Sequence, residues 1–101
     1  MQQGFNKREH FRTNVDFPVG IELPNQERIN ATAINIGKGG MLLDCSAHEH
    51  FSKLDDVNLH LPLNHNQNNY AISAKITYIK DNQIGLFFYS DPSEYLEKVI
   101  N

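Results

Sequence analysis

The stretch Tyr70-Ala71-Ile72-Ser73-Ala74-Lys75-Ile76-Thr77-Tyr78 decides the fold, because its aliphatic and aromatic side chains alternate with small or polar ones. Successive side chains of an extended chain point to opposite faces, so this period of two predicts a strand with one face in a core and one in water. The same period recurs over residues 15–23 and 57–63. The side chains expected on the buried faces are Val15, Phe17, Val19, Ile21, Leu23, Val57, Leu59, Leu61, Leu63, Tyr70, Ile72, Ala74, Ile76 and Tyr78.

Three further strands are predicted over residues 29–36, 40–45 and 83–89. Turn-forming residues separate the strands, because glycine, asparagine, aspartate and proline favour tight reversals of the chain. These turn signals are Pro24-Asn25, Gly37-Lys38-Gly39-Gly40, the polar run 64–69 and Asp81-Asn82. Six short strands with tight connections predict an all-β fold, a six-stranded antiparallel β-barrel.

Two prolines interrupt the predicted strands, and both lie on the polar phase. Pro18 and Pro62 cannot donate a backbone hydrogen bond, so we expect them at edges or bulges of the sheet.

The C-terminal residues change from a period of two to a helical period. Asp91 can cap a helix, Pro92 suits its first position and Glu94 lies three residues after the cap. A short C-terminal α-helix is therefore predicted, and it must pack on the barrel to be stable. Its apolar face comprises Tyr95, Leu96, Val99 and Ile100.

Composition limits the possible classes of protein. The chain of 101 residues suits one domain, and 40% apolar against 21% charged residues suits a soluble globular fold. A formal charge of −3 disfavours a protein that coats nucleic acid. The single cysteine, Cys45, indicates a reducing compartment, and its simplest role is that of a small buried side chain. The absence of a signal-peptide pattern or a long apolar run favours a cytoplasmic protein with no membrane insertion.

A basic segment, Lys7-Arg8-Glu9-His10-Phe11-Arg12, directly precedes the first strand. Three basic residues against one acidic residue give it a formal charge of +2 in a negative chain. Guanidinium groups bind phosphate oxygens in pairs and can also bind guanine, so Arg8 and Arg12 are candidates for one anionic ligand. A solvated basic tail is the simpler interpretation of this segment alone.

A glycine-rich segment, Asn35-Ile36-Gly37-Lys38-Gly39-Gly40, lies between two predicted strands. Glycines let backbone N–H groups approach a ligand, and the amide of Asn35 can both donate to and accept from a base. The segment matches neither a Walker loop nor a dinucleotide-binding fingerprint. Taken alone, it is also consistent with an ordinary glycine-rich hairpin.

Together, in this order and around six strands, the two segments resemble the PilZ family. That family pairs Arg-x-x-x-Arg before its first strand with Asp/Asn-x-Ser-x-x-Gly after its second. Arg8 and Arg12 complete the first motif here, and Asn35 and Gly40 match the second, with Gly37 in place of the usual serine. The resemblance extends to Phe17-Pro18-Val19, Gly85-Leu86-Phe87-Phe88 and the closing helix.

The resemblance implies a receptor for cyclic di-GMP without a cofactor. Residues 1–13 are then a flexible arm that folds over the ligand, and residues 14–101 are the barrel with its helix. A protein effector in motility, pilus or biofilm control would read the bound state, and a ligand-linked dimer is a further expectation. The implied ligand contacts are Arg8, Arg12, Asn35, Gly37 and Gly40, with additions from Lys7, Lys38 and Gly39.

Two alternatives to the receptor remain open from the sequence. The chain can be a degenerate PilZ-like adaptor that acts by protein contact, or a small barrel that binds single-stranded nucleic acid, although no nucleic acid is expected for so acidic a chain. An enzyme is not predicted, because no nucleophile–base or paired-carboxylate arrangement survives the strand assignment. The spacing of the five histidines does not predict a metal site.

Overall fold

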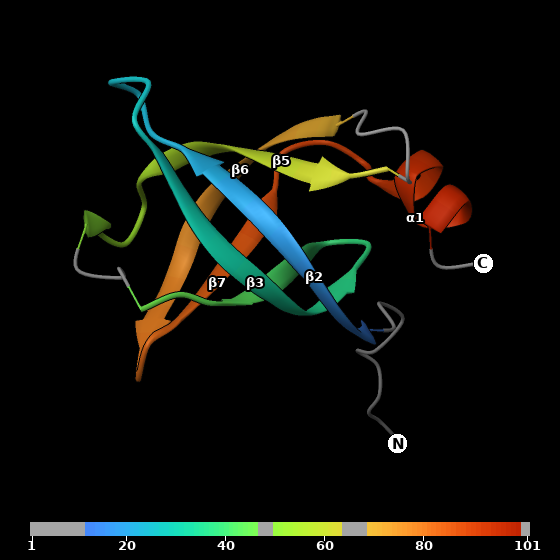
Figure 1. Cartoon of the computed structure of the whole chain (residues 1–101), viewed down its shortest axis with the longest axis horizontal. Coiled ribbons are helices and arrows are strands. Elements are labelled where there is room, and N and C mark those ends of the chain that lie inside the picture. Colours follow the sequence, from blue (N-terminus) through green and yellow to red (C-terminus); the bar gives the residue numbers. More distant parts are fainter. Residues whose placement is uncertain (1–11, 47–49, 64–68, 100–101) are drawn as a thin grey trace, which may run out of the picture.

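Six antiparallel strands close into a barrel in the order β2-β3-β4-β7-β6-β5, as the sequence predicts (Figure 1). The computed structural model describes residues 12–46, 50–63 and 69–99. The elements are β2 (Arg12–Glu22), β3 (Arg28–Gly37), β4 (Gly40–Asp44), β5 (Asp56–Pro62), β6 (Asn69–Lys80), β7 (Gln83–Phe88) and α1 (Ser93–Val99).

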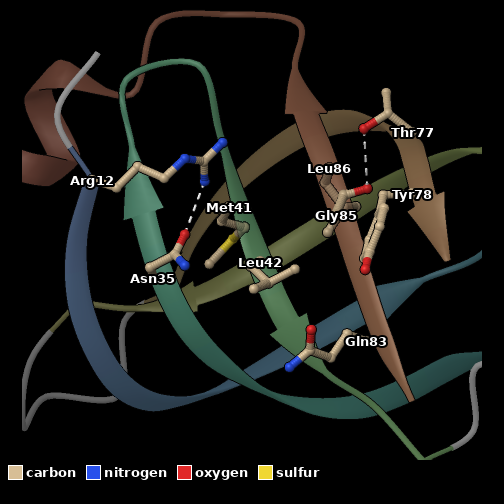
Figure 2. A pocket seen from close by; sticks show the side chains of 9 residues that line it. All are labelled: Arg12, Asn35, Met41, Leu42, Thr77, Tyr78, Gln83, Gly85 and Leu86. Atoms are coloured by element: carbon tan, nitrogen blue, oxygen red, sulfur yellow. Dashed lines mark hydrogen bonds between the residues drawn. The ribbon is translucent and has the colours of Figure 1, made fainter. Parts of the chain in front are cut away.

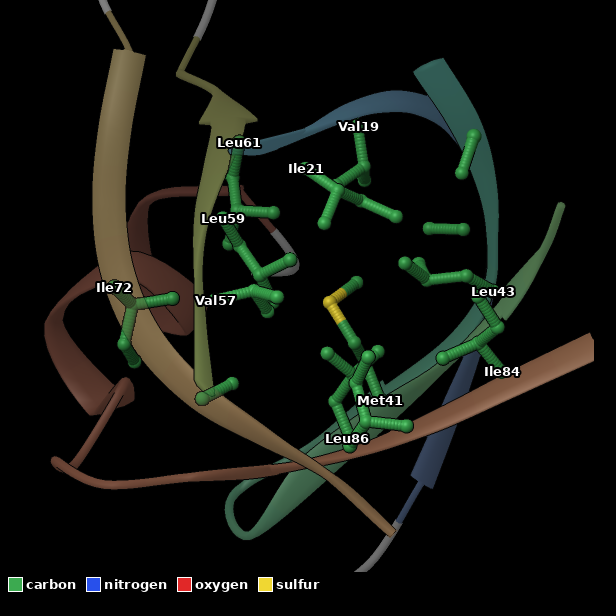
Figure 3. Close-up of a cluster of buried hydrophobic side chains, with 14 of the residues drawn as sticks. Val19, Ile21, Met41, Leu43, Val57, Leu59, Leu61, Ile72, Ile84 and Leu86 are labelled. Atoms are coloured by element: carbon green, nitrogen blue, oxygen red, sulfur yellow. The ribbon is translucent and has the colours of Figure 1, made fainter. Parts of the chain in front are cut away.

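The core fills the inside of the barrel with aliphatic side chains from every strand (Figure 3). The alternation in the sequence predicts eight of these nineteen buried side chains, and three of the eight, Ile21, Leu59 and Leu61, are fully buried. Cys45, predicted to be a small buried residue, is also buried among them. The interior therefore excludes water, and any ligand must be met on the outer surface or at an end.

Register shifts interrupt three strands and change which face some residues occupy. They fall between Asn14 and Phe17 on β2, between Ala33 and Asn35 on β3, and between Ile76 and Tyr78 on β6. Because one extra residue reverses the alternation, Tyr78 lies on the outer face and is 43% exposed. The prediction that Tyr78 belongs to the core is therefore wrong.

Pro18 and Pro62 flank the point where the β2–β5 pairing ends. The last pair of that ladder towards the prolines is Gly20 with His60, and each proline lies two residues beyond it on its own strand. A residue without an N–H is tolerated there because the ladder no longer needs its donor. The sequence predicts an edge or bulge where no ladder donor is needed, and the end of this ladder is consistent with that prediction.

The predicted turn between β6 and β7 is tight and has the backbone conformation that such hairpins need. Asp81 and Asn82 have φ values of 56° and 66°, and Lys80 pairs with Gln83 across them. Positive φ at both central residues is the signature of a type I′ turn, which asparagine and aspartate tolerate. This turn fixes the positions of Gln83, Gly85 and Tyr78 in the hairpin.

Helix α1 begins as predicted from its cap. The Asp91 carboxylate accepts a hydrogen bond from the Ser93 backbone N–H at 2.9 Å, and Leu96 N–H donates to the Pro92 carbonyl at 2.9 Å. Tyr95 is fully buried and anchors the helix to the barrel. Its ring stacks on Tyr70 with the centroids 5.0 Å apart, and its hydroxyl donates to the Pro62 carbonyl at 2.8 Å.

Replacing Tyr95 with phenylalanine should remove the hydrogen bond to Pro62 while keeping the packed ring. The loss is expected to cost about 1 kcal/mol, which lowers the melting temperature by about 4–8 °C. Burial also raises the pKa of Tyr95 to about 12 from 10.0. The stability that neutral Tyr95 contributes is therefore complete below pH 10 and is lost as the pH rises towards 12.

Thermal melts between pH 7 and pH 12 on wild type and Tyr95→Phe would test both parts. Tyr89→Phe is the matched control, because Tyr89 is 49% exposed and lies outside the core. Equal melting curves for wild type and Tyr95→Phe at every pH would contradict the anchoring role of the hydroxyl.

Candidate ligand-binding site

Arg12 and Asn35, one residue from each sequence motif, meet at the start of β2. Arg12 pairs with Gly37 of β3, and this register places its side chain beside Asn35. The Arg12 Nη1 group donates a hydrogen bond to Asn35 Oδ1 at 2.9 Å (Figure 2). Both side chains keep solvent access, so the guanidinium still has donors to offer to an anion.

A row of paired residues runs outward from Asn35 across four strands. Asn35 pairs with Leu42, Leu42 with Gly85, and Gly85 with Tyr78. The middle of this row is low, because Gly85 has no side chain. A hollow of about 360 Å³ lies over it, and Arg12, Asn35, Tyr78 and Gln83 are among the residues that line it (Figure 2).

Gly85 is required by the close approach of Tyr78. A Cβ at position 85 would lie 3.0 Å from the Cβ of Tyr78, and 3.6 Å from two of its ring carbons. The tyrosine side chain thus covers the glycine and forms one wall of the hollow.

A second hollow of about 370 Å³ adjoins Arg12 on the side of the glycine-rich turn. The two hollows share Arg12, Thr77 and Leu86 in their linings. The second hollow is lined in addition by Gly37, Gly39 and Phe87. The guanidinium of Arg12 therefore stands between two neighbouring depressions, one towards Tyr78 and one towards Gly39.

The three consecutive residues after Gly37 have different surroundings. A Cβ on Gly40 would lie 1.9 Å from the Leu86 carbonyl oxygen, whereas a Cβ on Gly39 would meet no atom within 4 Å. The close packing of β4 against β7 therefore requires a glycine at position 40. The expected contact of Gly40 with a ligand stays a prediction. Phe88 N–H donates to the Gly39 carbonyl at 2.9 Å and fixes the turn against β7.

Lys38 is exposed and carries the positive charge of this turn. The pKa of Asp91 is lowered mainly by hydrogen bonds from the Ser93 hydroxyl and backbone N–H, and to a smaller extent by the charge of Lys38. Lys38 thus already has an acidic neighbour at the start of α1. A ligand phosphate would compete with Asp91 for this ammonium group.

The basic segment lies largely outside the described residues. Lys7 and Arg8, which are expected to contact a ligand, lie outside the residues that the structure describes. Strand β2 begins at Arg12, so Arg12 and Thr13 are part of the barrel, although the sequence places them in the arm.

Tyr78 and Gln83 line the first hollow, and the sequence motifs do not indicate them. The two-residue turn Asp81-Asn82 could have revealed them, since counting back from it places Tyr78 opposite Gly85. An outward tyrosine opposite a glycine would then have marked a hollow on the surface.

Other chemistry is limited within the described ranges. Among residues 12–46, 50–63 and 69–99, no group of three or more His, Cys, Asp or Glu side chains is placed to hold a metal ion. His10, His48 and His65 fall outside these ranges. In the same part of the chain, no helix has the length and apolar character needed to span a membrane.

The fold is that of a small barrel domain, and its surface carries two hollows beside the exposed Arg12. The model of the PilZ domain family matches residues 6–101, and the chain belongs to this family. No curated protein sequence matches the chain at a significant level.

Three solved structures share the fold at low sequence identity. The inhibitor of motility MotI/DgrA from Bacillus subtilis has a TM-score of 0.73 and 17% identity, with 95% of this chain and 49% of that chain covered. The present chain thus spans about half the length of that protein. The PilZ domain of CeSA from a cellulose-synthesizing bacterium has a TM-score of 0.70 and 15% identity, with 89% of this chain and 91% of that domain covered. The PilZ domain of YcgR from Escherichia coli, solved with c-di-GMP, has a TM-score of 0.70 and 11% identity, with 92% of this chain and 86% of that domain covered.

Proposed function

We propose that the chain is a bacterial cytoplasmic receptor for cyclic di-GMP that has no catalytic activity of its own. The observation that carries this proposal is the hydrogen bond between Arg12 and Asn35, which joins the two motifs of the sequence beside two hollows. Membership of the PilZ family and the c-di-GMP bound to the PilZ domain of YcgR support it.

The exposed guanidinium of Arg12 is suited to the phosphates, because its planar donors match phosphate oxygens in pairs. Arg8 and Lys7 of the preceding segment would add positive charge. A guanine would contact the side-chain amide of Asn35. It would also contact the backbone of Gly37 and Gly39.

A protein partner would read the ligand-bound surface. Phe87 lines the second hollow and is 52% exposed, and its ring contacts Tyr89 at 6.2 Å between centroids. A ligand that covers Phe87 would change this aromatic surface without changing the core. The same surface favours the second candidate function, an adaptor that acts by protein contact alone.

Calorimetric titration of the purified protein with cyclic di-GMP at low and at high salt tests the proposal. We expect binding that weakens severalfold at high salt, because the arginine–phosphate attraction is partly screened. No heat at either salt would refute the receptor and favour the adaptor. A parallel titration with single-stranded DNA should show no binding.

A further inference from the structure

We propose that the outer face of the barrel around Gly20 is a docking site for an extended peptide segment of a protein partner, and that Arg28 binds a carboxylate of this segment. The site goes beyond the binding of cyclic di-GMP, and its described lining shares no residue with the two hollows at Arg12. Its basis is a hollow of about 190 Å³ on this face. The side chains around Gly20 that line it include Pro18, Arg28, Asn30, His60 and Pro62.

This hollow lies on the side of the barrel opposite the hollows at Arg12. Strands β2 and β5 pair through Gly20 and His60, whereas the first hollow at Arg12 lies over the pair of Leu42 with Gly85 on β4 and β7. In the closed order β2-β3-β4-β7-β6-β5, the β2–β5 ladder is halfway around the barrel from the β4–β7 ladder (Figure 1). A partner on this face and a ligand at Arg12 can therefore be bound at the same time.

Gly20 leaves the space in which the Arg28 side chain lies. A Cβ on Gly20 would be 3.2 Å from Arg28 Cδ and 3.6 Å from Arg28 Nε, so the arginine crosses β2 above the glycine. Arg28 remains exposed to solvent at the start of β3. A long side chain that already lies against the sheet loses less conformational freedom when it binds a ligand.

The acidic neighbour of Arg28 is engaged by a histidine. Glu22 pairs with Arg28 in the β2–β3 ladder, yet Glu22 Oε1 lies 2.7 Å from His60 Nε2, and these two side chains are only 31% and 19% exposed. Among the residues that the structure describes, no side chain accepts a hydrogen bond from the Arg28 guanidinium or forms an ion pair with it. The planar donors of Arg28 are thus available to an incoming carboxylate, whose oxygens they match in pairs.

The surroundings favour a peptide over a small ion or a nucleotide. A neighbouring hollow of about 580 Å³ continues the first, since Pro18 and Asn30 line both. The amide of Asn30 can donate to and accept from one peptide group where the two hollows meet. In the described linings of both hollows there is no aromatic side chain, so neither offers a stacking platform for a base.

Charge and length specify the segment further. Arg28 lines only the smaller hollow and Asp44 only the larger one, so a carboxylate is expected at one end of the segment and a basic side chain at the other. The linings run from Asp44 on β4 to Asn69 on β6. Four steps between strands of about 4.8 Å each give about 19 Å, which an extended chain of about six residues covers.

Nuclear magnetic resonance titrations with the capped peptide acetyl-Glu-Ala-Ala-Ser-Ala-Lys-amide test the inference. In ¹⁵N-labelled wild type, we expect the Arg28 Nε–H and the Asn30 side-chain amide resonances to shift. Replacing the glutamate of the peptide by glutamine should weaken binding at least about fivefold, and Arg28→Gln should weaken binding of the original peptide by a similar factor. Arg12→Gln is the matched control and should bind the peptide like wild type, because Arg12 lies outside the described linings of these two hollows.

Two results would overturn the inference. One is a peptide that leaves the Arg28 and Asn30 resonances in place, or that binds Arg28→Gln as tightly as wild type while thermal melts show the variant to be folded. The other is acetate alone producing the same shifts at the same concentration as the peptide, since the hollow would then take a carboxylate without a peptide. Neither result bears on the binding of cyclic di-GMP at Arg12.

Discussion

Replacing Gly40 by alanine is expected to lower the melting temperature by about 12–24 °C. The added Cβ would lie 1.9 Å from the Leu86 carbonyl oxygen, a backbone atom that cannot swing away. Strands β4 and β7 would have to separate at the Gly40–Phe87 pair, next to the buried Met41 and Leu86. We expect a cost of about 3 kcal/mol, at the upper end for overpacked sites, and about 4–8 °C for each kcal/mol.

The neighbouring Gly39→Ala is the matched control for this experiment. A Cβ on Gly39 meets no atom within 4 Å. The unfolding free energy of Gly39→Ala should therefore stay within about 0.5 kcal/mol of wild type. Thermal melts followed by circular dichroism compare the two variants with wild type. Equal melting of Gly40→Ala and Gly39→Ala would contradict the packing role of Gly40.

The pattern of apolar residues predicts the fold well, because a barrel needs only alternation and tight turns. Strands β5 and β7, the cap at Asp91 and the turn at Asp81-Asn82 all follow from residues close together in the chain. The pairings of β2 with β5 and of β4 with β7 join distant parts of the sequence. Periodicity alone does not specify those partners.

The register shifts are the part of the fold that the alternation of apolar residues does not predict. One extra residue near Thr77 changes no composition, yet it moves Tyr78 from the core to the wall of a hollow. The site is affected in the same way, since the motifs predict Arg12 and Asn35 but not the wall opposite them. Packing also explains Gly40, which the motif alone assigns to the ligand.

Replacing Arg12 by alanine is expected to weaken cyclic di-GMP binding at least about a hundredfold. Each charge-assisted hydrogen bond contributes about 1.5–3 kcal/mol, and an arginine can make two of them to one phosphate. Loss of two such bonds, about 3–6 kcal/mol, corresponds to at least about a hundredfold in affinity. Arg12 is exposed and donates a side-chain hydrogen bond to Asn35, so the unfolding free energy of the variant should stay within about 0.5 kcal/mol of wild type.

Two further variants separate the geometry of Arg12 from its charge. Arg12→Lys keeps the charge but loses the planar fork, so its affinity should fall between those of wild type and Arg12→Ala. Arg28→Ala removes an exposed arginine at the other end of the β2–β3 ladder, where Arg28 pairs with Glu22, and should bind like wild type. Calorimetry at one salt concentration gives all four affinities. If Arg12→Ala binds as well as Arg28→Ala, the ligand does not use the place where the two motifs meet, and the site must lie elsewhere on the barrel.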